Sequence, residues 1–221
     1  MSRVMSMTTT VVEAATAPPV DLLLARAHLR ALDIAPSTDD LLIESWVLAA
    51  ASYFEEYTGR PILTQTFETW LDAFPIEDRI ELPHPPLVEV VSVRYIASDG
   101  TLTDFTDGAS PESPLWTTKA PAGLYAKRGW IAPVSGQSWP VARDESGAVR
   151  IRYRAGYATS AGQVPDIIRS ALLLMVGSSD RFRAGLHISE GARVEALPFG
   201  VDQMIQAFKY TALPSQVLHR W

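Results

Sequence analysis

The stretch at residues 36–62 reads PSTDDLLIESWVLAAASYFEEYTGRPI and predicts one long helix with a defined beginning and end. Ser37 or Thr38 offers a side-chain oxygen that accepts a hydrogen bond from an amide of the first turn, and the acids that follow suit the positive end of the helix dipole. Gly59 favours the left-handed conformation that ends a helix, and Pro61 prevents its continuation.

An apolar stripe follows one side of this predicted helix. Its members recur at spacings of three and four residues, which place side chains on one face of a helix. They are Leu42, Trp46, Ala49, Tyr53 and Tyr57. We expect this stripe to pack against the neighbouring helix.

That neighbour is a helix predicted over residues 20–34, in which four apolar residues share one side. Only a short connection separates the two helices, so we expect an antiparallel helical hairpin over residues 20–63. Residues 1–19 are rich in Thr, Ala and Pro and lack the long apolar core of a secretory signal. We expect them to form a flexible N-terminal arm.

The composition of the 221 residues predicts a folded chain without disulfides. Hydrophobic residues make up 47% of it, which is enough for a sizeable core, and it contains no cysteine. No apolar run reaches the roughly 18 residues that a membrane span requires. We therefore expect no membrane partner.

Charge is divided unevenly between the two halves of the chain. Residues 1–112 contain 18 acidic and 6 basic side chains, whereas residues 113–221 contain 7 acidic and 13 basic ones. This division would suit head-to-tail contacts between copies, acidic surface against basic. The alternative is an uneven spread of charge over solvated surface.

The hydrophobic period changes to two after Pro61, which predicts an inserted antiparallel β domain over residues 64–157, beginning with a meander over residues 65–106. Its clearest strand alternates apolar residues with Arg150, Arg152 and Arg154. Guanidinium groups on one face suit phosphate or the acids of a neighbouring subunit. A solvated outer face, or an edge strand protected by charge, explains them equally well.

A third helix is predicted at residues 158–185, apolar nearly all round and therefore buried in the core. Residues 186–221 follow as a loop and an extended C-terminal tail, giving an α+β fold. This tail is too apolar to remain free in water, so we expect it to dock on another protein surface. The residues assigned to docking are Leu197, Pro198, Phe199, Val201, Met204, Ile205, Phe208, Tyr210, Leu213 and Trp221.

Motifs for catalysis are missing from the sequence. The four histidines, His28, His84, His187 and His219, show no metal-ligand spacing, and there is no HExxH, GxSxG, P-loop or GxGxxG motif. We therefore expect no enzyme, no bound metal and no cofactor.

The order of several segments resembles the head-tail connector (adaptor) family of long-tailed bacteriophages and phage-like gene transfer agents. The resemblance covers roughly residues 20–210, with departures in the N-terminal arm, at residues 177–188 and after Tyr210. It rests on EEYTGRPILTQTFETWLDAFP, IELPHPPLVEVVSVRYIASDG, GQSWPVARDESGAVRIRYRAGYA, VPDIIRSALLLMV and LPFGVDQM.

This resemblance implies a structural part of a virion or gene-transfer-agent particle, made in the bacterial cytoplasm and located at the head-tail junction. About twelve copies would form a ring beneath the portal protein and join the DNA-filled capsid to the next stopper or tail protein. DNA would pass through the channel without specific binding. The family's C-terminal segment reaches into the portal, which suits the apolar tail.

A second hypothesis is a carbohydrate-binding or host-recognition β module carried on a helical stalk. Trp130 and Trp139 could stack on a sugar or a base if both were exposed. Large aromatic residues under an irregular loop are otherwise part of a small satellite core.

Overall fold

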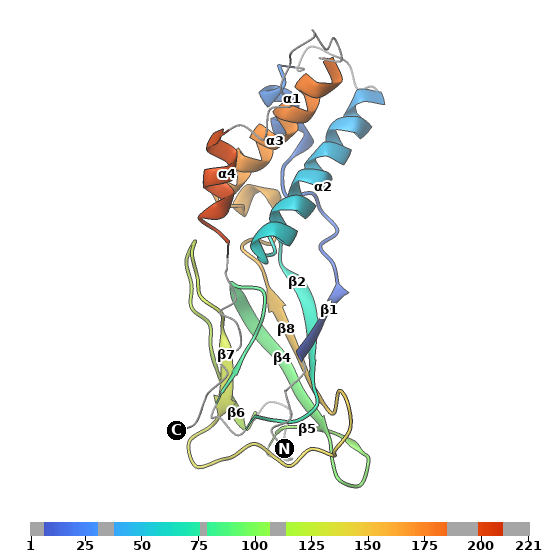
Figure 1. Cartoon of the computed structure of the whole chain (residues 1–221), viewed down its shortest axis with the longest axis vertical. Helices are drawn as coiled ribbons and strands as arrows, with labels where there is room; N and C mark the ends of the chain where they lie inside the picture. The colour runs from blue at the N-terminus through green and yellow to red at the C-terminus, as the bar shows by residue number, and fades with distance from the viewer. Residues whose placement is uncertain (1–6, 31–37, 76–78, 107–113, 185–198, 210–221) are drawn as a thin grey trace. The chain divides into compact units, whose positions relative to one another are not determined.

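The computed structural model describes residues 7–30, 38–75, 79–106, 114–184 and 199–209. They combine helices with antiparallel sheets, as the predicted α+β class requires (Figure 1). The chain forms two compact units. The β unit takes Met1–Asp21 and Pro61–Pro165, and the helical unit takes Leu22–Arg60 and Asp166–Trp221.

A five-stranded antiparallel sheet has its last strand in sequence near its centre. Its order is β1 (Met7–Glu13), β2 (Gln65–Leu71), β8 (Val149–Ala155), β4 (Leu87–Ile96) and β5 (Leu102–Asp104). Figure 1 shows β8 between β2 and β4. The meander predicted over residues 65–106 is wrong for β2 and β4, because β8 lies between them, whereas β4 and β5 pair as neighbouring antiparallel strands.

Strand β1 occupies part of the segment for which we expected a flexible arm. It pairs with β2, placing Thr8 opposite Trp70 and Val11 opposite Phe67. The hydroxyls of Thr9 and Thr69 lie 2.8 Å apart. The run MTTTVVE favours an extended strand because its Thr and Val residues are β-branched, and the edge of β2 gives it backbone partners.

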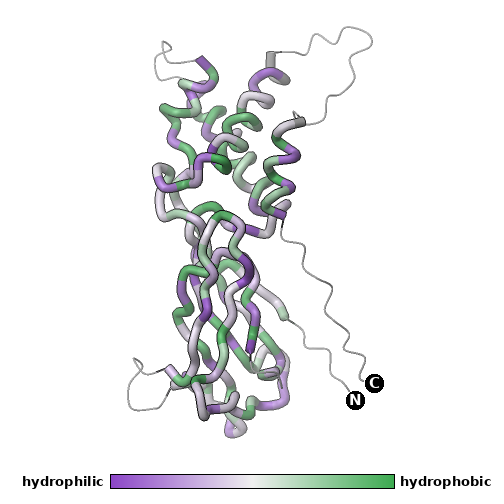
Figure 2. Tube along the Cα trace, turned by 90° about the vertical axis from the view of Figure 1, so that its left-hand side faces the viewer, coloured by the Kyte–Doolittle hydropathy of each residue, from purple (hydrophilic) through white to green (hydrophobic). Residues whose placement is uncertain are grey.

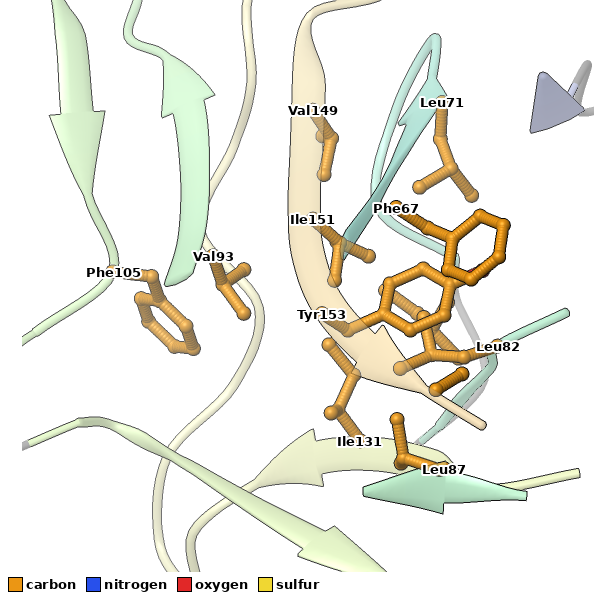
Figure 3. Packing of buried hydrophobic residues seen from close by; sticks show 12 residues of the cluster. Phe67, Leu71, Leu82, Leu87, Val93, Phe105, Ile131, Val149, Ile151 and Tyr153 are labelled. Carbon is orange, nitrogen blue, oxygen red and sulfur yellow. The ribbon is translucent and has the colours of Figure 1, made fainter. Parts of the chain in front are cut away.

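A three-stranded sheet completes the β unit, in the order β3 (Ile80–Glu81), β7 (Trp130–Pro133) and β6 (Trp116–Lys119). Side chains of both sheets share one hydrophobic core, in which labelled residues of β2, β8 and β7 point toward one another (Figure 3). The core consists of Phe67, Leu71, Ile80, Leu82, Leu87, Val93, Phe105, Ile131, Val149, Ile151, Tyr153 and Ala155. A short 3-10 helix, Ala161–Gln163, comes near the end of the unit.

The helical unit contains α1 (Leu22–His28), α2 (Thr38–Thr58), α3 (Asp166–Ala184) and α4 (Phe199–Gln206). Helix α3 contacts α1, α2 and α4. Helix α1 is shorter than predicted, because the chain turns at Arg30, whose φ is 57°. Residues 31–34 of the predicted helix lie outside the described residues.

Helix α2 forms and ends as predicted, but it buries a different face. The amide of Gly59, with φ 68°, donates to the carbonyl oxygen of Glu55 over 2.8 Å and ends the helix. The buried side chains are Ile43, Val47, Ala50, Ala51 and Phe54. Of the predicted stripe, Ala49 and Tyr53 are exposed and the other three are half-buried. Both sets have helical spacing, so spacing alone does not identify the buried one.

Helix α3 is buried on one face and not all round. Its buried residues are Ile168, Ala171, Leu172, Met175 and Val176. Leu174 is 38% exposed, so the expectation that the helix is buried all round is wrong. Figure 2 shows hydrophobic and hydrophilic residues interspersed along the helices. The exposed apolar side chains of the helical unit are therefore available for contacts outside it.

Candidate interaction surfaces

The three arginines predicted from the alternating strand share one face of β8. The intervening residues Val149, Ile151, Tyr153 and Ala155 are fully buried in the core. Because β8 has hydrogen-bonded neighbours on both sides, the interpretation of the arginines as protection of an edge strand is wrong.

Acids of the same sheet neutralise two of these arginines. Arg152 donates from Nε and Nη2 to one carboxylate oxygen of Glu68 on β2, over 3.1 and 2.9 Å. Arg154 donates to Glu89 on β4 over 2.8 Å. In each case the strand register places the two residues directly opposite one another. The arginine face is thus a surface of mixed charge.

Glu68 accepts hydrogen bonds from two side chains of this face, Trp70 and Arg152. Burial opposes its ionisation, but hydrogen bonds from Trp70 and Arg152, together with the positive charges of Arg152 and Arg150, lower the pKa of Glu68 below its ordinary value. The Trp70 indole donates to it over 2.8 Å. Arg150 itself lies opposite Arg94, which pairs with Asp104 at 2.8 Å.

A shallow groove of about 470 Å³ crosses this face. Its polar lining residues are Glu13, Thr64, Thr66, Glu89, Arg152 and Arg154, and Ala14 and Val91 add a small apolar part. The Thr66 hydroxyl donates to Glu13 over 3.0 Å. Carboxylates repel phosphate, so this lining favours a protein surface that also carries both signs of charge over a nucleic-acid backbone.

The two tryptophans of the sugar-binding hypothesis have different surroundings. Trp139 stacks on Phe74 with ring centres 4.9 Å apart and an angle of 10°, and packs at the edge of the β core. Its ring also lies 5.5 Å from that of Phe105. Trp130 is a half-buried residue of β7, with the Arg79 guanidinium 6.0 Å from its ring centre. Trp139 therefore belongs to a satellite of the core, and its stacked face is not open to a sugar.

Part of the predicted docking tail packs inside this chain. Val201, Ile205 and Phe208 are 0–1% exposed, and Met204 is half-buried. Phe208 meets Phe54 of α2 edge to face, with ring centres 5.4 Å apart. Internal packing thus accounts for much of the hydrophobic density at residues 199–208.

Phe199 begins α4. Leu197, Pro198, Tyr210, Leu213 and Trp221 lie outside the described residues. Their docking stays a prediction.

A second apolar surface lies on α2, opposite its buried face. Leu41 is 69% exposed and Leu48 is 52% exposed. Ser45, Ala49 and Ser52 are exposed beside them. We call these five residues the outer face of α2. Leu41, Ser45, Leu48 and Ser52 also recur at spacings of three and four residues, so the sequence contains a helical pattern for this face. The predicted stripe did not include it.

Helices α1 and α3 border a groove of about 530 Å³, which we call the α1–α3 groove. Leu29, Leu174 and Gly177 provide its apolar part, and charged or polar residues provide the rest. A side chain at Gly177 would meet the His28 ring, because an added Cβ would lie 3.1 Å from Nε2. The other lining residues are His28, Arg30, Ser178, Asp180 and Arg181.

The described residues contain no group of three or more His, Asp or Glu side chains that could hold a metal ion. Within the same part of the chain, none of the helices combines the length and apolarity of a membrane span.

No protein-family description and no curated protein matches the sequence. Chains in several solved structures do match it in structure. A chain in the neck of an empty GTA particle computed with C6 symmetry matches with a TM-score of 0.70 and 19% identity, over 94% of this chain and 98% of that one. This chain shares its fold.

Two further solved structures contain chains with the same fold. The virion of a native gene transfer agent (GTA) particle gives a TM-score of 0.69 and 22% identity, over 94% of this chain and 97% of that one. The neck of a native GTA particle computed with C12 symmetry gives a TM-score of 0.68 and 19% identity, over 94% of this chain and 98% of that one. The likeness therefore spans both the β unit and the helical unit.

Proposed function

We propose that this chain is a structural head-tail connector in the neck of a gene transfer agent or a related tailed phage particle. The observation that carries the proposal is the likeness of nearly the whole fold to chains in GTA necks, with TM-scores of 0.68–0.70. Matching lengths support it, since 97–98% of each similar chain is covered. The role is one of assembly and requires no catalysis.

In this proposal, copies of the chain form a closed ring of about twelve. Two of the similar necks were computed with C6 and C12 symmetry, which supports a ring. A ring built from one kind of subunit needs two different complementary surfaces on each copy. The charge division between residues 1–112 and 113–221 supports such contacts.

The ring would join the portal protein of the DNA-filled capsid to the stopper or tail protein, at the head-tail junction. Residues after Lys209, among them Tyr210, Leu213 and Trp221, are the proposed docking segment, because α4 already packs within the chain. Arg150, Arg152 and Arg154 are proposed to contact a neighbouring subunit as part of a surface of mixed charge.

DNA would pass through the channel of the ring without specific binding. The formal net charge of -6 supports weak interaction with the phosphate backbone. Neutralisation of Arg152 and Arg154 by Glu68 and Glu89 supports it further, because paired guanidinium groups have less free charge to offer.

Deletion of this gene in the producing bacterium, followed by negative-stain electron microscopy, tests the role. We expect heads separated from complete tails, and restoration of tailed particles when the gene is supplied on a plasmid. Normal tailed particles in the deletion strain would refute the proposal. The carbohydrate-binding alternative is weakened by Trp139, whose ring is already stacked on Phe74.

A further inference from the structure

The helical unit carries two surfaces of different chemistry that share no residue. One is the outer face of α2, and the other is the α1–α3 groove. Leu41 and Leu48 lie two helical turns apart on the outer face, and more than half of each side chain is exposed. The serines and the alanine beside them are small, so another element can approach the helix closely there.

The charge of α2 is entirely negative. Its sequence, TDDLLIESWVLAAASYFEEYT, contains five acids and no basic residue. Asp40 pairs with Arg26 at 3.6 Å, whereas Glu44 is exposed beside the outer face. Two copies that met through their α2 outer faces would bring acids against acids. Such a contact between identical faces is therefore disfavoured.

The α1–α3 groove offers the opposite chemistry. Arg30 and Arg181 are both exposed on its lining, and Leu29 and Leu174 give it apolar surface. Asp180 is the single acid among its lining residues. The groove can thus accept leucine side chains and meet the carboxylates that accompany them.

We propose that the outer face of α2 in one copy docks into the α1–α3 groove of the next copy. Leu41 and Leu48 enter against Leu29 and Leu174, and Glu44 meets the arginines of the groove. Because the two surfaces differ, each docked pair leaves one α2 face and one groove free, and the contact repeats from copy to copy. The inference rests on the ring of the proposed function and identifies the contact that builds it.

Cysteine cross-linking tests this contact directly, because the chain has no cysteine of its own. Ser45→Cys lies on the outer face and Ser178→Cys in the groove, and both changes are nearly isosteric. The purified full-length chain at high concentration, and particles from the producing cells, are treated with a short bis-maleimide. With both cysteines in one chain, we expect a ladder of multimers.

The matched controls separate this contact from other arrangements. An equal mixture of the two single variants should give dimers and nothing larger, whereas each single variant alone should stay monomeric. Dimers of Ser45→Cys alone would show that identical faces meet, and would overturn the proposal. The pair Ser178→Cys and Gln203→Cys should give no ladder, because Gln203 is exposed on α4 and outside both surfaces.

Charge reversal adds a readout that does not depend on the cross-linker. Glu44→Arg should lower the yield of the ladder at least about fivefold, since it places like charges together. Adding Arg181→Glu should restore part of it. Thermal unfolding of these variants should match that of the parent chain, because both residues are exposed. An unchanged ladder with Glu44→Arg would refute the assigned contact.

Failure of the contact and failure of the neck role have different outcomes. Absence of a ladder both in solution and in particles, combined with a junction defect in the deletion strain, would reject this contact and keep the neck role. A ladder combined with normal tailed particles in the deletion strain would reject the neck role and keep the self-association.

Discussion

Arg60 donates a hydrogen bond from Nε to the carbonyl oxygen of Phe208 over 2.7 Å, across 148 positions of sequence. Arg60 is 4% exposed and Phe208 is 1% exposed, so the bond lies inside the helical unit. The ring of Phe208 packs on Phe54, and the ammonium of Lys209 lies 4.7 Å from the centre of the Tyr57 ring. The segment that ends at Lys209 is therefore part of the core of this unit.

Replacement of Arg60 should destabilise the helical unit. In Arg60→Met the alkyl part is retained, but the buried carbonyl oxygen of Phe208 loses a charged donor. We expect a loss of about 1.5–3 kcal/mol in the free energy of unfolding, measured by urea titration of the helical circular dichroism. Arg79→Gln, which breaks an exposed ion pair with Glu81, should cost less than about 1 kcal/mol. Equal losses in the two variants would contradict this account.

Two truncations should separate the packed part of the C-terminal segment from the part proposed to dock. A chain ending at Ala196 loses α4 and uncovers the surface buried by Val201, Ile205 and Phe208, each of which contributes about 1.5–3 kcal/mol. A chain ending at Lys209 keeps them. In thermal unfolding, we expect only the shorter chain to melt at a much lower temperature.

The chain that ends at Lys209 is then the proper test of docking. If the chain ending at Lys209 folds normally but fails to join heads to tails, residues 210–221 are the docking segment. Normal tailed particles from it would exclude that role.

Stability should fall in acid as Glu68 becomes protonated. Its folded-state pKa is lowered, so its contribution is complete above the unfolded-state value near 4.5 and disappears as the pH falls below it. Glu68→Gln should cost about 0.5–1 kcal/mol at pH 7, a modest figure because Arg152 is 41% exposed. The difference from the parent chain should shrink between pH 5 and pH 3, measured by urea unfolding at each pH. A difference that did not change with pH would contradict the assignment, and Arg152→Gln should show the same trend.

Gly156 should tolerate no side chain. Its φ is 147°, and an added Cβ would lie 2.6 Å from the backbone nitrogen and Cα of Thr64. We expect Gly156→Ala to destabilise the β unit by at least about 1–3 kcal/mol, measured by thermal unfolding. Gly162→Ala is the matched control, because an added Cβ there has open space around it, and it should change stability by less than about 0.5 kcal/mol.

Local signals in the sequence predicted most helices and strands, but not which faces they bury. Gly59 ended α2 as expected, and the alternation along residues 149–155 marked the strand β8. The buried face of α2 could not be chosen, because two apolar stripes run along the same helix and only its contacts with other helices distinguish them.

Long-range pairing was the part that the sequence did not reveal. Strand β8 lies between β2 and β4, which are distant in sequence: Arg152 pairs with Glu68, 84 residues away, and Arg154 pairs with Glu89, 65 residues away. The pairing of β1 was not predicted either, because the hydrogen-bond partners of its backbone lie on β2, more than 50 residues away along the chain. The alternation along β8 did predict its buried and exposed faces, because that period depends on the strand alone.

The insertion of residues 61–165 between the two parts of the helical unit also sets an order of events on the ribosome. Strands β2 to β8 emerge before α3, so the β unit can complete its sheets while α2 still lacks its contacts with α3 and α4. Only the arrival of Phe208 supplies the carbonyl that Arg60 requires. Nascent chains therefore carry a β unit able to fold while α2 still waits for α3 and α4, and the apolar surface of α2 is open to chaperones during this interval.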